Sequence, residues 1–263
     1  MTSLQWECFC NFKKEFKEKV DLWKSQAPEL ADLQKAAVEK AGAPLYPFET
    51  SVVYNKALDD VTENDDIKLI VIGDNPGKDE QLSKNNRYLV GQAGKIAEGY
   101  FRRNQELSID FRKNVIILNK TPIHSGKTAQ LKTIASAGGE KIKRLIEESQ
   151  IWMAERTAQL HIELSKFAEN NNMLPEIWLV GYSELKNKGI FRKYGECLKN
   201  YYFNNSLDCS EFWENVFVFQ HFSMNRFSID LGEFIKKDNG AEKRSLAENI
   251  HLLGKIHVKE IFK

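Results

Sequence analysis

The chain has 263 residues, of which 42% are hydrophobic and 29% are charged, a composition typical of a globular protein and not of a disordered one. It contains no apolar run of 18 residues and no basic stretch followed by an apolar segment near Met1, so we expect neither membrane insertion nor secretion and predict a cytoplasmic protein. The net charge is +1, but residues 1–66 carry 8 Lys or Arg against 13 Asp or Glu, whereas residues 67–263 carry 30 against 24. The mildly basic larger part is compatible with a small nucleic-acid contact surface.

Residues 1–66 predict a helical extension that packs on a larger domain. Phe12–Trp23 places apolar side chains at helical spacing among lysines and acids, and Glu29–Ala41 predicts a second helix. The acidic segment Asp59–Asp66 predicts a surface loop before the first strand. We expect the second unit, residues 67–263, to form an α/β domain.

Strand-like and helix-like segments alternate along residues 67–263. This alternation predicts an α/β fold in three layers, with an open, mostly parallel sheet flanked by helices. The predicted strands are Ile67–Ile72, Asn114–Leu118, Pro175–Val180 and Trp213–Gln220. The predicted helices are Lys95–Arg103, Glu140–Asn170 and Ala241–Leu253, the last followed by a short strand or tail over Lys255–Phe262.

The loop after the first strand, Gly73-Asp74-Asn75-Pro76-Gly77, is the most informative part of the sequence. Such strand ends are where α/β proteins place their ligands. The glycines permit backbone angles closed to other residues and Pro76 fixes one φ, so we expect Asp74 and Asn75 on a rigid, exposed corner.

This loop resembles the first motif of the uracil-DNA glycosylase superfamily, which reads Gly-Glu-x-Pro-Gly in the thermophile-type branch and Gly-x-Asn-Pro-Gly in the mismatch-specific branch. The following Leu89–Gly94 is similar to that family's Phe-Val-Gly-x-Ala/Ser-Gly. Downstream, Asn119 ends a strand as the family's base-reading Asn does, and His221-Phe222-Ser223 resembles the family's His-Pro-Ser. The resemblance covers roughly residues 67–228 and implies a uracil-DNA glycosylase-like fold.

The resemblance also implies a function, hydrolysis of the bond between deoxyribose and uracil or a related deaminated base in DNA, as in base excision repair. Asp74 would favour the sugar cation and orient water, Asn75 would hold that water, and His221 would donate a hydrogen bond to the departing base. Asn119 would read the base edge, which would lie against Leu89 and, if its ring swings in, Tyr88. The remaining predicted residues would contact DNA, with Arg226 as the preferred wedge in the gap left by the flipped base: Gly77, Gln92, Ser223, Met224 and Arg226.

Each of these residues also has a structural interpretation. Asp74 can cap the following turn, Asn75 can tie its side chain to the backbone, and Asn119 can satisfy loop amides. His221 follows an apolar strand and can be a hydrogen-bonded core histidine, with His124 as a minor alternative for the site role.

Cys8, Cys10, Cys197 and Cys209 show neither a zinc spacing nor a Cys-x-x-Cys pair, so we expect free thiols, no metal or iron–sulfur cluster and no cofactor. Two other functions stay open. One is a glycosylase-fold protein that binds nucleic acid or a protein partner with weak or no catalysis, which Leu89 and Phe222 favour because they replace the family's Phe and Pro. The other is an unrelated hydrolase or nucleotide-binding enzyme that uses the Gly73–Gly77 loop.

Overall fold

The computed structural model describes residues 1–169, 174–204 and 209–263. Its strands form one parallel sheet in the order β2-β1-β3-β4, which confirms the prediction of an α/β fold with a parallel sheet flanked by helices. The strands are β1 (Leu69–Gly73), β2 (Val115–Asn119), β3 (Glu176–Val180) and β4 (Val216–Phe219). Each lies within or next to a predicted apolar run, and burial on both faces explains why these runs do not alternate with polar residues.

The strand order places a reversal at the centre of the sheet. The chain passes from β1 outward to β2 and then crosses back over β1 to form β3 on its other side. Open α/β sheets bind ligands at the carboxyl edge near such a reversal. The register pairs Gly73 with Asn119, so the segments that follow β1 and β2 start side by side.

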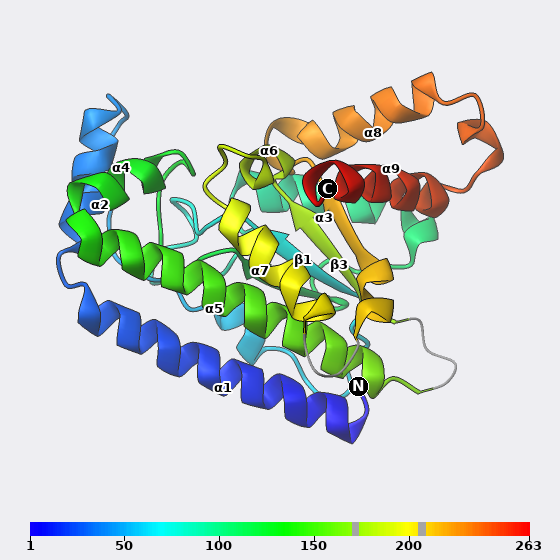
Figure 1. Ribbon diagram of the computed structural model, residues 1–263, viewed down its shortest axis with the longest axis horizontal. Coiled ribbons are helices and arrows are strands. Elements are labelled where there is room, and N and C mark those ends of the chain that lie inside the picture. Colours follow the sequence, from blue (N-terminus) through cyan, green and yellow to red (C-terminus); the bar gives the residue numbers. More distant parts are fainter. Residues whose placement is uncertain (170–173, 205–208) are drawn as a thin grey trace.

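Helices cover the sheet, with α5 and α7 in front of the strands and α3 behind them in Figure 1. The helix α1 lies along α5, and Phe16 and Trp23 pack against Trp152 there. The extension of residues 1–66 thus shares one apolar core with the sheet. The α-helices of the described chain are α1 (Ser3–Gln26), α2 (Leu30–Lys40), α3 (Gln92–Arg103), α4 (Gln130–Ala137), α5 (Gly139–Lys166), α6 (Tyr182–Leu185), α7 (Arg192–Phe203), α8 (Arg226–Lys237) and α9 (Leu246–Ile261).

The C-terminal region differs from the prediction. The helix predicted to begin at Ala241 begins at Leu246, because Ser245 and Glu248 form a capping box there. The strand or tail predicted over Lys255–Phe262 is wrong, because α9 continues to Ile261 and buries His257 and Val258 on the face that already carries Ile250. The helix predicted over Glu140–Asn170 ends earlier, at Lys166, where the backbone N–H of Phe167 closes its last turn; Asn170 itself lies outside the described residues.

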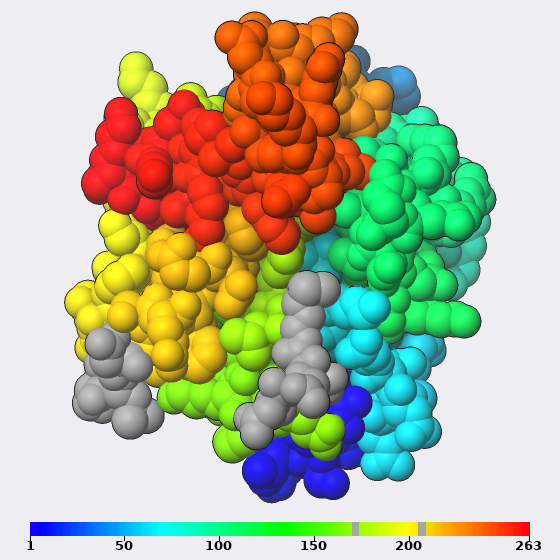
Figure 2. All heavy atoms as spheres, turned by 90° about the vertical axis from the view of Figure 1, so that its right-hand side faces the viewer, coloured from blue at the N-terminus to red at the C-terminus, as the bar shows by residue number. Residues whose placement is uncertain are grey.

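The two ends of the sheet are covered differently. Figure 2 shows α8 and α9 (orange to red) at one end of the visible side of the molecule and the first residues of α1 (blue) at the other. The N-terminal residues lie beside Ile67 and Pro175, which precede β1 and β3, and therefore at the amino edge of the sheet. The candidate site lies at the opposite, carboxyl edge, where the loops after the strands meet and α8 begins.

Candidate functional site

A pocket of about 390 Å³ opens at the carboxyl edge of the sheet, within the volume range of small-molecule sites. Its lining comes from the segments that follow β1, β2 and β4 and from the start of α3. Eight of the eleven residues predicted for the site line this pocket: Asp74, Asn75, Gly77, Leu89, Gln92, Asn119, His221 and Ser223. The other three, Tyr88, Met224 and Arg226, do not.

Asp74 forms a buried ion pair with Lys120, a residue that the sequence analysis missed. The Lys120 Nζ lies 2.6 Å from Asp74 Oδ1 and 2.5 Å from the Val180 carbonyl oxygen, and its side chain is 0% exposed against 12% for that of Asp74. Burial lowers the pKa of Lys120, while the charge of Asp74 opposes that shift. Lys120 therefore fixes one oxygen of the carboxylate and supplies its counter-charge.

The other oxygen of Asp74 contacts a second residue of the pocket lining. Thr128 Oγ1 donates to Asp74 Oδ2 at 3.3 Å. A Cβ atom at Gly181, whose φ is +98°, would lie 2.3 Å from Asp74 Oδ1. Only glycine combines this backbone conformation with room for the carboxylate, so the segment after β3 helps to position Asp74.

Asn75 is held by the loop that follows β2. Its Nδ2 donates to Ser125 Oγ at 2.9 Å and approaches the carbonyl oxygens of Pro76 and Ser125 at 3.2 and 3.3 Å. This agrees with the interpretation of Asn75 as a turn-forming residue. Its side-chain oxygen accepts no hydrogen bond from the described residues, so it remains available as an acceptor.

Asn119 is 2% exposed and lines the pocket, yet its Nδ2 has no hydrogen-bond partner among the described residues. The side chain crosses Gly73, where a Cβ atom would come within 2.4 Å of Asn119 Oδ1. An unpaired buried donor costs free energy of about 1–3 kcal/mol unless something accepts from it. Asn119 thus brings an unpaired donor to the pocket lining.

His221 presents a defined tautomer. The backbone N–H of Ser223 donates to His221 Nδ1 at 3.0 Å, and Ser223 Oγ lies 2.8 Å from the same nitrogen. Burial lowers the pKa of His221, with Asp74 opposing the shift and Lys120 adding to it. The neutral ring therefore carries its proton on Nε2, which bonds to none of the described residues.

Glu80 is a second pocket residue that the sequence analysis missed. Its carboxylate accepts from the backbone N–H groups of Gly77 at 2.9 Å and Leu89 at 2.8 Å, and so joins the two motif loops. Burial raises the pKa of Glu80 to about 7, although the two N–H groups oppose the shift. The signal in the sequence was its position three residues after Gly77, as in a capping interaction.

The base-stacking role predicted for Tyr88 has no support in the arrangement, because its ring is buried in the core and its hydroxyl donates to the Val53 carbonyl at 2.6 Å. Leu89 lines the pocket, and none of the described lining residues is Phe, Tyr or Trp.

Met224 and Arg226 do not line the pocket, although they follow closely after Ser223, which does. Met224 is 74% exposed and adopts a left-handed backbone conformation, with φ of +52°. Arg226 is exposed at the first turn of α8. Phe222, which stands where the resembled motif has Pro, is buried against Phe227, so an apolar contact anchors the loop.

The N-terminal extension is linked to the loop after β1 by two hydrogen bonds through His124. Tyr46 donates from its hydroxyl to His124 Nε2, and His124 Nδ1 donates to the Pro76 carbonyl, both at 2.8 Å. Burial lowers the pKa of His124 to about 4, so the ring is neutral. With both ring nitrogens engaged and no exposed surface, His124 is a structural residue.

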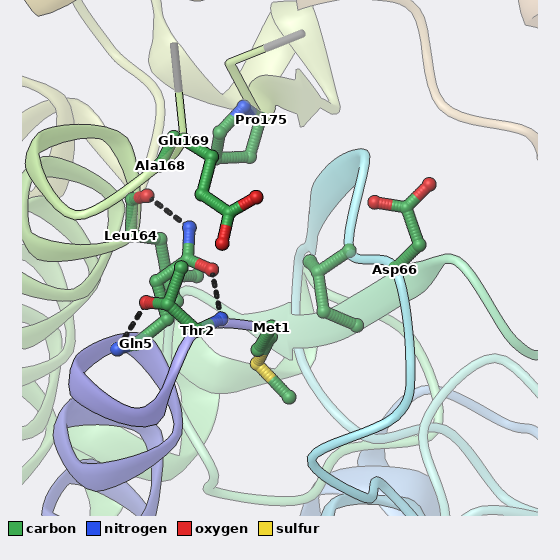
Figure 3. Close-up of a pocket in the computed structure, with 9 residues that line it drawn as sticks. Met1, Thr2, Gln5, Asp66, Leu164, Ala168, Glu169 and Pro175 are labelled. Carbon is green, nitrogen blue, oxygen red and sulfur yellow. Dashed lines mark hydrogen bonds between the residues drawn. The ribbon is translucent and has the colours of Figure 1, made fainter. Parts of the chain in front are cut away.

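A smaller hollow of about 150 Å³ lies at the opposite, amino edge of the sheet (Figure 3). There Thr2 and Gln5 form a capping box at the start of α1, and Gln5 also donates to the Leu164 carbonyl. Thr2 and Gln5 are thus engaged in helix capping, while the lining also includes the carboxylates of Asp66 and Glu169.

No family model matches this chain, and neither a curated protein nor a solved structure matches it. Within the described residues, no group of three His, Cys, Asp or Glu side chains is placed to hold a metal ion. None of the described helices is long and apolar enough to cross a membrane. The four cysteines are unpaired.

Proposed function

We propose that the protein hydrolyses the N-glycosidic bond of uracil or a related deaminated base in DNA. The observation that carries the proposal is the unpaired, buried Nδ2 of Asn119 in a pocket that also holds Asp74 and His221. Uracil and its relatives present carbonyl oxygens along their edges, which such a donor recognises.

The residues support a division of roles. The carboxylate of Asp74 favours the positive charge that develops on the sugar as the bond between C1′ and the base breaks and the base takes the electron pair. A water molecule then adds its oxygen to C1′, and its proton neutralises the base. His221 donates from Nε2 to a base oxygen as negative charge gathers there, an effect comparable with an oxyanion-hole donor at about 3 kcal/mol.

Asn75 and Lys120 assist the same step without contacting the base. The free side-chain oxygen of Asn75 accepts a hydrogen bond from the attacking water. Lys120 does not line the pocket, and its contact with Asp74 makes it a positioning residue for that carboxylate.

The test is release of uracil from single-stranded and G·U-containing oligonucleotides by the wild type and by Asp74→Ala, Asn119→Ala and His221→Ala. We expect His221→Ala to lower the single-turnover rate by about 100-fold or more. His251→Ala serves as the matched histidine control, since His251 pairs with Glu176 near the amino edge of β3 and should leave the rate unchanged. Release that is insensitive to all three pocket substitutions would contradict the proposed roles.

A second candidate function is nucleic-acid binding through the same fold without efficient catalysis. The observation that favours it is the lack of Phe, Tyr or Trp among the described lining residues, because stacking on an aromatic ring contributes about 1–3 kcal/mol per base. DNA binding with no release of uracil, hypoxanthine or xanthine would select this function. The nucleotide-binding alternative has no observation in its favour, because the lining carries Asp74, Asp79 and Glu80 beside Lys78 and Lys127 and so does not single out phosphate as a ligand.

A further inference from the structure

Four exposed lysines lie on the pocket lining, on the helix that follows it and on the loop in contact with that helix. Lys127 lines the pocket, Lys132 follows on α4, and Lys186 and Lys188 lie in the segment between α6 and α7. Lys132 Nζ donates to the Lys188 carbonyl at 2.9 Å, so α4 and this segment are in contact. In Figure 1 both lie on the side to which the arrowhead of β3 points.

These four lysines, which we call the basic ridge, lack acidic partners. Among the described residues, no carboxylate oxygen lies within 4.0 Å of any of their ammonium groups. Neighbouring cations differ in this respect, because Arg192 pairs with Glu196 at 2.7 Å and Lys193 with Glu147 at 3.0 Å. The ridge therefore carries ammonium groups without a direct ion-pair partner, although Lys186 lies over the Tyr182 ring, with Nζ 4.1 Å from its centroid.

The surface around the ridge is concave. One hollow of about 540 Å³ lies between α4, α5 and the start of α7 and includes Lys132 in its lining. Another, of about 840 Å³, lies between the 186–192 segment and the end of α9 and includes Lys186 and Lys188. The first hollow also includes Glu140 and Glu147 and the second Glu196 and Glu260, so the lysines themselves, and not the hollows as a whole, are the basic feature of this surface.

We propose that the basic ridge binds the phosphate backbone of the DNA strand whose base enters the pocket. This inference rests on the proposed function for the direction of the strand. The lack of ion-pair partners at four neighbouring lysines supports it, because phosphates can supply the missing negative charge, while the Asp74 carboxylate inside the pocket suits a developing sugar cation. Lysines bind phosphate as point charges, so this contact gives affinity without reading sequence.

The experiment measures binding separately from chemistry. A fluorescein-labelled single-stranded oligonucleotide with a stable abasic-site analogue is titrated with the wild type and with the double variant Lys132→Gln/Lys188→Gln over a series of salt concentrations. Each lysine that no longer neutralises a phosphate should reduce the slope of log affinity against log salt by about 0.7, so we expect a reduction of about 1.4 for the two substitutions. The matched control is Lys14→Gln/Lys17→Gln on exposed positions of α1, which removes the same charge and should leave the slope unchanged.

The outcomes separate the ridge from the proposed function. A reduced slope in the ridge variant alone supports the ridge, even if the wild type releases no base. A slope equal to that of the wild type and the control overturns the ridge, even if uracil is released. Labelled polyglutamate is titrated in parallel, and a larger loss for polyglutamate than for the oligonucleotide would overturn the assignment to DNA in favour of an acidic protein.

Discussion

Removing the carboxylate of Asp74 should destabilise the fold because it leaves the buried ammonium group of Lys120 without its counter-charge. Unit charges 2.6 Å apart attract by about 6 kcal/mol at an effective dielectric constant of 20. Asp74 borders the pocket, so water weakens this attraction, and Lys120 keeps the Val180 carbonyl as a partner in Asp74→Ala. We therefore expect Asp74→Ala to lower the free energy of unfolding by about 3 kcal/mol at pH 7, the low end of the range for breaking a buried pair.

The double-mutant cycle isolates the pair itself. In Asp74→Ala/Lys120→Met neither charge remains buried, so this variant should be more stable than Asp74→Ala alone, with a coupling energy of about 2 kcal/mol. Urea unfolding followed by tryptophan fluorescence gives the four free energies. The exposed pair Lys237 and Glu233, 3.7 Å apart, is the control and should show far weaker coupling. Single costs that add within about 0.5 kcal/mol would refute the reasoning.

The pH dependence provides an independent check on the same pair. The folded chain holds the proton of Lys120 less tightly than the unfolded chain, because burial lowers the pKa from its ordinary 10.5. Stability linked to Lys120 is therefore lowest below the folded pKa and rises as the pH approaches 10.5. Without Asp74 the folded pKa falls further, so the cost of Asp74→Ala should shrink between pH 7 and pH 9.5. A cost that grows over this range would contradict the assigned cause.

Two further predictions concern the loops around the pocket. Because burial raises the pKa of Glu80 from 4.5 to about 7, the stabilisation linked to its protonation is present below pH 4.5 and is lost as the pH rises through 7. Glu80→Gln should remove a decline of about 3 kcal/mol in unfolding free energy over this window, and urea titrations at several pH values would show an unaltered decline if Glu80 is not its source. Gly181→Ala should lower stability by about 1–3 kcal/mol and displace Asp74, since it adds a Cβ atom at positive φ against the carboxylate. Thermal melts of both variants provide the measurement. Gly232→Ala in α8, where a Cβ atom meets nothing within 4 Å, should instead be neutral or stabilising, and equal effects of the two substitutions would contradict this reasoning.

The sheet could be predicted from the sequence because its strands are buried on both faces and therefore read as continuous apolar runs. The run before Gly73 and the run before Asn119 form adjacent parallel strands, which places the residues after them at one edge. The end of α9 was not predicted, because the polar residues of Lys255–Lys259 obscure an apolar face that continues through Val258. A helix that keeps one buried face tolerates many charges on the other.

The candidate site was predictable only where chemistry follows directly from chain position. Asp74, Asn119 and His221 each lie at or just after the end of a strand, so their convergence needs nothing beyond a parallel sheet. The position of Tyr88 depends instead on two acceptors in residues 53–55. The Val53 carbonyl oxygen accepts from the Tyr88 hydroxyl, and Asn55 Oδ1 accepts from the Tyr88 backbone N–H. These two hydrogen bonds come from the N-terminal extension, whose path no local pattern reveals.

Lys120 shows why a functional neighbour can remain hidden in a sequence. A lysine after a strand is ordinarily solvated, and nothing local distinguishes this one. Its burial results from three separate segments: Asp74 after β1, the Val180 carbonyl at the end of β3, and the Phe191 ring, whose centroid lies 5.1 Å from Nζ. Because all three surround the same cation, the position of Asp74 is tied to the ends of both strands, and any substitution that moves one of them should also move the carboxylate on which the proposed chemistry depends.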